Sequence, residues 1–299
     1  MRVVLAGASG FLGSRLRASL ASDGHDLVQL VRRPPRDERE RQWDPYTGSL
    51  DAGVLDGADV VVNLAGAPVY NKRWTSAYKQ VIIASRTRST GTLAQAVASL
   101  PVGWRPAVLV NASAIGYYGD RGDIPVEEES PPGSGFFPEV CQAWEAATAP
   151  AADAGVRVVR IRSGLVLKAG GGILRPLALA TRLFASGPLA GGRQWMPWIS
   201  MADWVGAVRF AIDRGDLAGP VNVVGPDPVR NKDFTRALAR ALHRPAPWPI
   251  PRFAMRMVFG EFANNIVASQ RVMPGVLNRA GYAFQHSDVD SAIRAAFAS

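Results

Sequence analysis

The chain has 299 residues, of which 47% are hydrophobic and 20% are charged, and this composition excludes the disordered and fibrous classes. The formal net charge of +9 comes from basic residues that are dispersed along the chain. We attribute it to an anionic ligand or to a generally basic proteome, and we expect no nucleic-acid partner. The single cysteine can form neither an internal disulfide nor a clustered-cysteine metal site. The apolar run after Met1 is short for a signal peptide, and no later stretch approaches about 18 uninterrupted apolar residues. We therefore expect a cytoplasmic protein without a membrane span, and the oligomeric state stays open.

The first half of the chain alternates short apolar runs with segments of helical period. This alternation predicts an α/β protein of the Rossmann type, with a doubly wound parallel sheet buried on both faces. The predicted strands are Arg2–Ala6, Leu27–Val31, Val60–Asn63, Ala107–Asn111 and Val158–Ile161. Three helices are predicted in this half. The first begins at about Phe11, the second runs from beyond Trp74 to about Leu100, and the third covers Pro138–Ala152.

The regular alternation ends after Gly164, where turn residues become frequent. We therefore expect a first domain over residues 1–165 and a smaller, irregular part over residues 166–299, interleaved with the first. The second part should contain a strand at Val221–Val224 and helices near Asp203–Ile212, Lys232–Leu242 and Asp288–Phe297. Its tryptophans Trp195, Trp198 and Trp204 either line a pocket or build the core, and core is favoured for at least two of them.

A glycine-rich turn, GASGFLG, follows the first predicted strand and opens the first predicted helix. A tight strand-to-helix turn with free N–H groups at the positive helix end is what a dinucleotide pyrophosphate needs. The alternative is a glycine turn without a ligand, but the placement between strand and helix favours a nicotinamide dinucleotide. The residues expected to bind it are Gly7, Ser9, Gly10, Phe11, Leu12 and Gly13.

The end of the second predicted strand indicates which dinucleotide binds. NAD-binding proteins have an acidic residue there, roughly 20 positions beyond the turn, which holds the ribose 2′-hydroxyl. This chain has Arg32 and Arg33 instead. A guanidinium presents a rigid fork of donors to phosphate oxygens, so the pair favours the 2′-phosphate of NADP over a merely solvated basic loop.

Further motifs extend along the whole chain. They are Asn63–Gly66, Lys72–Trp74, Ser85–Arg86, Gly116–Asp120, Trp144–Glu145, Arg162–Gly164, Gly171–Gly172, Trp195–Asp203 and Asn222. Together with GASGFLG they make the sequence resemble the extended short-chain dehydrogenase/reductase superfamily. Within it, the chain is similar to the atypical proteins grouped with the NAD-dependent epimerases and dehydratases, a sugar-epimerase family of uncertain substrate.

The resemblance implies roles for several of these residues. Beside the cofactor ribose we expect Leu64, Ala65 and Gly66, and facing the cofactor or the pocket we expect Arg86 and Arg162. The strand that ends at Ser113 would border the nicotinamide. The resemblance also implies a small polar substrate, with phosphorylated and nucleotide-linked molecules included, held between the two parts.

The chain departs from this superfamily in its catalytic pair, a tyrosine four residues before a lysine on one helical face. The lysine charge lowers the pKa of that tyrosine, so the phenol can exchange a proton with the substrate. No tyrosine of this chain is followed by lysine at the fourth position. On the helix where the pair belongs, we place Val140 and Trp144 at the two positions.

The remaining candidates for a proton donor are Ser113, Tyr117 and Tyr118, with Glu145 and Cys141 as weaker ones. Each has an ordinary structural alternative, such as capping a strand end or satisfying a buried carbonyl. The three histidines lack the spacing of metal ligands, so we expect no metal site.

The sequence therefore predicts an NADP-dependent oxidoreductase or epimerase-like protein acting on a small molecule. The alternative is a catalytically silent NADP-binding sensor or scaffold, which the missing tyrosine and lysine favour. An RNA-binding role has the least support, because no nucleic-acid-binding motif accompanies the basic residues.

Overall fold

Across residues 1–70 and 72–298, which the computed structural model describes, the centre of the protein is an eight-stranded sheet. Its strands lie in the order β12-β8-β6-β5-β1-β2-β3-β4, and every neighbouring pair is parallel except β3 with β4. The strands are β1 (Arg2–Ala6), β2 (Asp26–Val31), β3 (Glu40–Asp44), β4 (Ser49–Leu50), β5 (Val60–Asn63), β6 (Val108–Ala114), β8 (Arg157–Ser163) and β12 (Gly219–Val223). The chain winds outward from β1 in both directions, so the predicted doubly wound Rossmann-type sheet is confirmed.

Helices and short strands complete the structure. The helices are α1 (Phe11–Ser22), α2 (Ser76–Ser99), α3 (Phe136–Ala146), α4 (Ala149–Asp153), α5 (Leu174–Arg182), α6 (Met201–Asp213), α7 (Asn231–Leu242), α8 (Arg252–Phe259), α9 (Ala263–Ile266), α10 (Gly275–Arg279) and α11 (Val289–Ala298). The short strands are β7 (Pro125–Val126), β9 (Leu165–Leu167), β10 (Trp195–Met196), β11 (Trp198–Ser200), β13 (Val229–Arg230) and β14 (Arg271–Val272). In the described part of the chain, no helix has the length and apolar character to cross a membrane.

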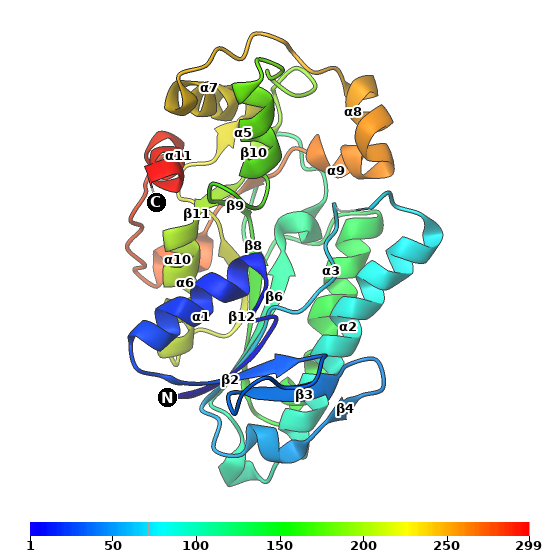
Figure 1. Cartoon of the computed structure of the whole chain (residues 1–299), viewed down its shortest axis with the longest axis vertical. Coiled ribbons are helices and arrows are strands. Elements are labelled where there is room, and N and C mark those ends of the chain that lie inside the picture. Colours follow the sequence, from blue (N-terminus) through cyan, green and yellow to red (C-terminus); the bar gives the residue numbers. More distant parts are fainter. Residues whose placement is uncertain (71, 299) are drawn as a thin grey trace.

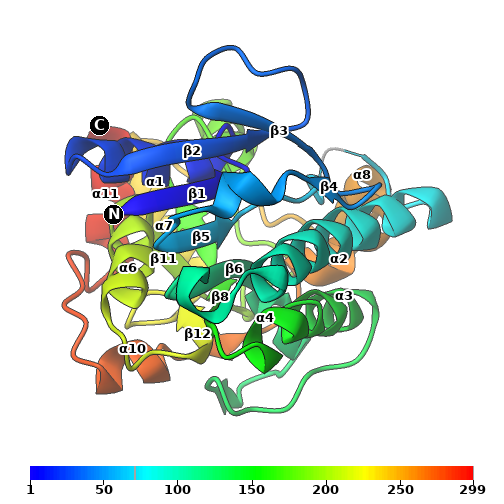
Figure 2. The ribbon, with the colours of Figure 1, turned by 90° about the horizontal axis from the view of Figure 1, so that it is seen from below.

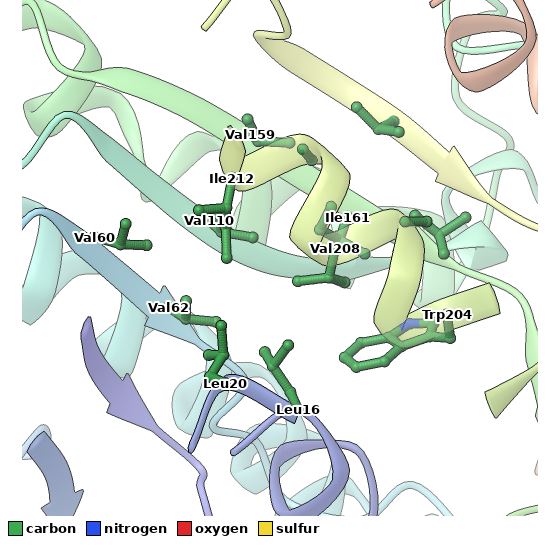
Figure 3. Close-up of a cluster of buried hydrophobic side chains, with 14 of the residues drawn as sticks. Leu16, Leu20, Val60, Val62, Val110, Val159, Ile161, Trp204, Val208 and Ile212 are labelled. Carbon is green, nitrogen blue, oxygen red and sulfur yellow. The ribbon is translucent and has the colours of Figure 1, made fainter. Parts of the chain in front are cut away.

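The sheet is covered on both faces, which explains why its strands are continuous apolar runs. Helices α1 and α6 pack on one face, while α2, α3 and α4 lie on the other (Figures 1 and 2). On the first face, side chains of the two helices meet alternate strand residues (Figure 3). The residues of this contact include Leu16, Leu20, Val62, Val110, Ile161, Trp204 and Val208.

The second half of the chain returns to the central sheet. Strand β12 pairs with β8, with Val221 opposite Ile161, and α6 covers the sheet beside α1. The predicted strand at Val221–Val224 and the predicted helix at Asp203–Ile212 are both present, and both belong to the central sheet and the layer that covers it. Helices α5, α7, α8 and α11 lie beyond the carboxyl ends of the strands, whereas α10 lies beside α6 (Figure 1).

Two details differ from the sequence prediction. The helix expected over Pro138–Ala152 begins at Phe136 and breaks after Ala146, because Pro150 lacks an N–H and its ring would clash with the carbonyl of Ala146. Strand β3 lies in the charged run that the sequence presented as a surface loop. It pairs with β2 near the sheet edge, where charged side chains can point to solvent.

Candidate functional site

The glycine turn between β1 and α1 is closely packed at its two ends and open in the middle. Gly7 has φ +79°, and a Cβ there would lie 2.7 Å from the Leu64 carbonyl carbon. A Cβ on Gly13 would lie 2.1 Å from the carbonyl oxygen of Gly7. At Gly10 the nearest atom to an added Cβ is that same oxygen, at 3.3 Å. Gly7 and Gly13 thus shape the turn, whereas Gly10 leaves space in front of it.

The open middle of the turn is also the start of α1. Gly10 is the N-cap of α1 and supplies no side chain to the first N–H groups, and Ser9 and Gly10 are exposed. The positive end of the helix therefore faces outward at the point where the sheet reverses its winding direction. Phe11 points elsewhere, because its ring fills the space against Gly171 and Gly172 of the second part.

The two arginines after β2 differ in their surroundings. The Arg33 guanidinium makes two hydrogen bonds of 2.6 Å to the Glu40 carboxylate. The hydrogen bond from Arg33, with a further one from the Arg36 N–H, lowers the pKa of Glu40 to about 2. Arg32 is exposed, and no side-chain hydrogen bond or ion pair of its guanidinium is found in the described part of the chain. Of the pair, Arg32 has the guanidinium that is open to a ligand.

The loop after β5 brings together the residues that the resemblance assigns to the ribose. The Asn63 side chain accepts a hydrogen bond from the Ala65 N–H at 3.1 Å and so holds the start of this loop. The Arg86 guanidinium carbon lies 3.4 Å from the Cβ position of Gly66 and 5.0 Å from the Trp144 ring. Burial lowers the pKa of Arg86. Arg86 is therefore a cation beside the Leu64–Gly66 loop.

A buried hydrogen-bonded chain runs behind the carboxyl ends of β6 and β8. Ser113 donates to Glu145 at 2.6 Å, and Arg162 donates to both oxygens of Glu145, at 2.8 and 2.9 Å. Arg162 also donates to the Tyr118 hydroxyl at 2.9 Å, which in turn donates to Asn222 Oδ1 at 2.7 Å. Although burial acts against it, the hydrogen bonds to Glu145 raise the pKa of Arg162.

These hydrogen bonds determine what the three candidate proton donors can do. Tyr118 is fully buried, and burial raises its pKa to about 12. Ser113 directs its single proton to Glu145. Tyr117 is half-buried, with its ring 3.5 Å from the guanidinium carbon of Arg162. Arg162, which was expected to face the cofactor or the pocket, is 3% exposed and lies between Glu145 and Tyr118, to which it donates hydrogen bonds.

The face of α3 toward β6 carries other residues than the sequence prediction placed there. Val140 packs with Trp74 and Ile82, and the Trp144 indole donates to Thr90. The residues directed at β6 and the turn after it are Phe137 against Gly116, Cys141 against the Ala114 carbonyl, and Glu145 against Ser113. Val140 and Trp144, which the sequence analysis placed at the positions of the catalytic pair, therefore do not lie on the face of α3 toward β6.

A cavity of about 580 Å³ opens at the carboxyl ends of β6 and β8. Its lining combines residues of both parts of the chain, among them Phe137 and Trp195.

Trp198 and Trp204 are 1% and 0% exposed, so the prediction that at least two of the three tryptophans build the core is confirmed. Ser163, which the sequence analysis named within the Arg162–Gly164 motif without giving it a role, ends β8 and also lines this cavity. Its position at the carboxyl end of a predicted strand was the available signal.

A second cavity, of about 970 Å³, lies between the smaller part and the loop that contains Asp120 and Asp123. The basic side chains in its lining are Arg193, Arg230, Lys232 and Arg252. No group of three or more metal-ligand side chains forms a cluster within residues 1–70 and 72–298.

The sheet, the glycine turn and the outward-facing start of α1 define an NAD(P)-binding protein of the Rossmann type. The model of the NAD-dependent epimerase/dehydratase family matches residues 3–225, and the chain belongs to this family. Residues 250–296 match a domain of unknown function.

Proteins of similar sequence and structure carry the same family name. An epimerase family protein of Mycobacterium bovis is 43% identical over 97% of this chain and 96% of its own length. Epimerase family protein SDR39U1 of Bos taurus is 35% identical over 98% of this chain and 99% of its own length. The crystal structure of human epimerase family protein SDR39U1 with NADPH has a TM-score of 0.90 and 30% identity, and it covers 99% of this chain and 98% of that chain.

Proposed function

We propose that this protein binds NADP(H) across the carboxyl ends of the sheet and acts as an oxidoreductase or epimerase-like protein on a small molecule in the 580 Å³ cavity. The observation that carries the proposal is the glycine turn, which leaves the start of α1 open at Gly10. The similar human protein was solved with NADPH, which supports the choice of dinucleotide.

In this proposal the pyrophosphate lies on the turn, whose residues are Gly7, Ser9, Gly10, Phe11, Leu12 and Gly13. Arg32 binds the 2′-phosphate, and Arg33 lies beside Arg32, where its hydrogen bonds to Glu40 hold it. The ribose lies against the loop of Leu64, Ala65 and Gly66, where Arg86 supplies a positive charge. Arg162 supports the site from behind through Glu145.

The nicotinamide, when bound, supplies or accepts a hydride. The residues of this chain must then handle the proton without a phenol on α3. Ser113 and Tyr117 are the proposed contacts, because Glu145 orients the first and Arg162 the second. Tyr118 is proposed to act through Arg162, since its hydroxyl is enclosed between Arg162 and Asn222.

A silent NADP-binding sensor is the second candidate, and the face of α3 favours it. Phe137 and Cys141 stand four residues apart on the face toward β6. Phe137 has no proton to exchange, and burial raises the pKa of the Cys141 thiol to about 12. Binding would then proceed without turnover.

A fluorescence titration of NADPH tests the proposal. Gly10→Val places a branched side chain where the pyrophosphate must approach the backbone, so we expect the affinity for NADPH to fall at least about 100-fold with the fold intact. The control is Gly103→Val, because a Cβ there meets no atom within 4 Å. Equal NADPH affinity of Gly10→Val and wild type would refute the assigned site.

A screen of carbonyl compounds that follows NADPH oxidation separates the enzyme from the sensor. With an active compound, Ser113→Ala and Tyr117→Phe should lower turnover about 100-fold if their hydroxyls assist proton transfer, and NADPH binding should stay unchanged. Tight NADPH binding without any turnover would favour the sensor.

A further inference from the structure

One wall of the 580 Å³ cavity is a cluster of aromatic rings from three segments. Trp74 precedes α2, Phe136 and Phe137 begin α3, and Phe262 follows α8. The Trp74 ring centroid lies 4.9 Å from Phe136, 5.1 Å from Phe137 and 5.3 Å from Phe262. Such distances are those of favourable edge and tilted ring pairs. The cluster, hereafter the aromatic wall, is therefore a packed surface.

Contacts between α2 and the segment around α8 hold Phe262 in this wall. Lys79 of α2 makes an ion pair of 2.6 Å with Glu261, and Arg73 donates to the Met257 carbonyl at 2.8 Å. In Figure 1, α8 and α9 lie next to the ends of α2 and α3. The second part of the chain thus supplies one ring to a wall built by the nucleotide-binding half.

Several polar groups at this cavity are engaged within the protein. The Trp74 indole donates to the Val69 carbonyl, and the Trp195 indole donates to Asp123. The Gln270 amide donates to two backbone carbonyls, and Glu261 holds Lys79. A sugar against the aromatic wall would leave hydroxyl groups without partners, which costs free energy.

Aliphatic side chains of the second part continue the apolar lining; they are Ile173, Leu177, Leu189 and Met196. Polar side chains also line the cavity, among them Ser134, Asn264, Asn265 and Ser163. Ser163 is the one at the carboxyl end of β8. It accepts the Trp204 indole N–H at 2.9 Å, and no acceptor for its own hydrogen is found among the described residues. An apolar molecule with one oxygen would match this combination of surfaces.

We propose that the cavity selects a ring-bearing, apolar carbonyl compound or the corresponding alcohol, and not a nucleotide-linked sugar. This inference rests on the proposed function, because the nicotinamide exchanges a hydride with carbonyl and alcohol carbons. The aromatic wall receives the ring of the ligand, and the size of the cavity is within the range of pockets for such molecules. It revises the polar substrate that the sequence resemblance implies.

A binding experiment tests the ligand class without requiring turnover. The probe is a dimethylaminonaphthyl ketone dye, whose emission moves to shorter wavelength when it leaves water, added to the protein with saturating NADP⁺. We expect saturable binding that simple aryl ketones reverse and UDP-glucose does not. Phe262→Ala should weaken dye binding about tenfold, because one ring of the wall is lost.

Controls separate this inference from the proposed function. Phe259→Ala removes a partly exposed ring three positions away that does not line the cavity, and it should leave dye affinity unchanged. Phe262→Leu keeps the apolar volume in case Phe262→Ala unfolds, and it should give an intermediate loss. NADPH affinity, measured separately, should be equal in all variants.

A wild type that binds NADPH but prefers UDP-glucose, or dye binding that neither Phe262 change affects, would overturn the apolar ligand class alone. A wild type that does not bind NADPH would overturn the proposed function.

Discussion

The β1–α1 turn and the β6–α3 region, both at the carboxyl ends of the strands, differ in how well they suit an enzyme that uses a dinucleotide cofactor. At β1 and α1, the turn has glycine at each position where a side chain would meet backbone or ligand. At β6 and α3, the helix face that should carry a phenol and an ammonium group carries Phe137 and Cys141. Both regions keep the fold of the family, since 99% of this chain aligns with the structure of a family member.

The contrast teaches that cofactor binding and proton transfer depend on different parts of the chain. In the proposed site, backbone N–H groups bind the pyrophosphate, so the site survives any change that keeps the glycine spacing. Proton transfer depends on the identity of individual side chains on one helix face. Such residues can change without altering the packing, as a phenylalanine at position 137 still fills the space beside Gly116.

The largest effect should come from breaking the buried ion pair behind the β6–α3 region. Arg162→Leu leaves Glu145, which is 5% exposed, without its cation, so the free energy of unfolding should fall by about 3–5 kcal/mol. Urea unfolding measures this change. Adding Glu145→Leu should restore part of the loss, because no buried charge is then unpaired.

The matched control for Arg162 is Arg236→Ala. Arg236 pairs with Asp233 on the surface of α7, and its loss should cost less than about 1 kcal/mol. Equal costs for the Arg162 and Arg236 changes would show that the buried pair contributes no more than a surface pair.

Sequence patterns predicted the sheet better than the helix face. Val60–Asn63 was predicted to the residue because a strand buried on both faces is a continuous apolar run. Strand β3 was missed, since its edge position permits charged residues such as Arg41. On α3, Val140 and Trp144 have the same four-residue spacing as Phe137 and Cys141, and spacing alone does not reveal which pair faces β6. The glycine turn was identified from sequence because its chemistry depends on residue type and order alone.

The next effect sharpens the comparison on the side of the β1–α1 turn. Arg32→Ala should reduce the preference for NADPH over NADH by about 1.5–3 kcal/mol, the contribution of a charge-assisted hydrogen bond, which corresponds to roughly 10- to 150-fold. Arg33→Ala should change the preference less, because Glu40 already holds its guanidinium. The measurement is the ratio of the two dissociation constants in each variant. A larger effect of Arg33 than of Arg32 would mean that the ligand displaces Glu40.

A smaller effect separates the two neighbouring tyrosines. Tyr118→Phe removes the partner of Asn222 Oδ1 and of one Arg162 N–H, so the free energy of unfolding should fall by about 1–3 kcal/mol. Tyr117→Phe should change stability less, because in the described part of the chain its hydroxyl makes no hydrogen bond. Thermal unfolding compares the variants, and an equal loss in both would contradict this assignment.

The smallest effect concerns acid stability at the Arg33–Glu40 pair. Arg33 holds the pKa of Glu40 at about 2, below its ordinary value of 4.5. A carboxyl group with a depressed pKa in the folded state stabilises the protein above the ordinary value and loses this contribution as the pH falls toward the folded value. Wild type should therefore lose stability relative to Glu40→Gln as the pH falls from 4.5 toward 2, and the difference should shrink in high salt because the Arg33 side chain is 39% exposed. Unfolding midpoints of the two proteins across this pH range measure the difference. Parallel pH profiles would show that Glu40 does not bind Arg33 in solution, and Arg33 would then be as open to a 2′-phosphate as Arg32.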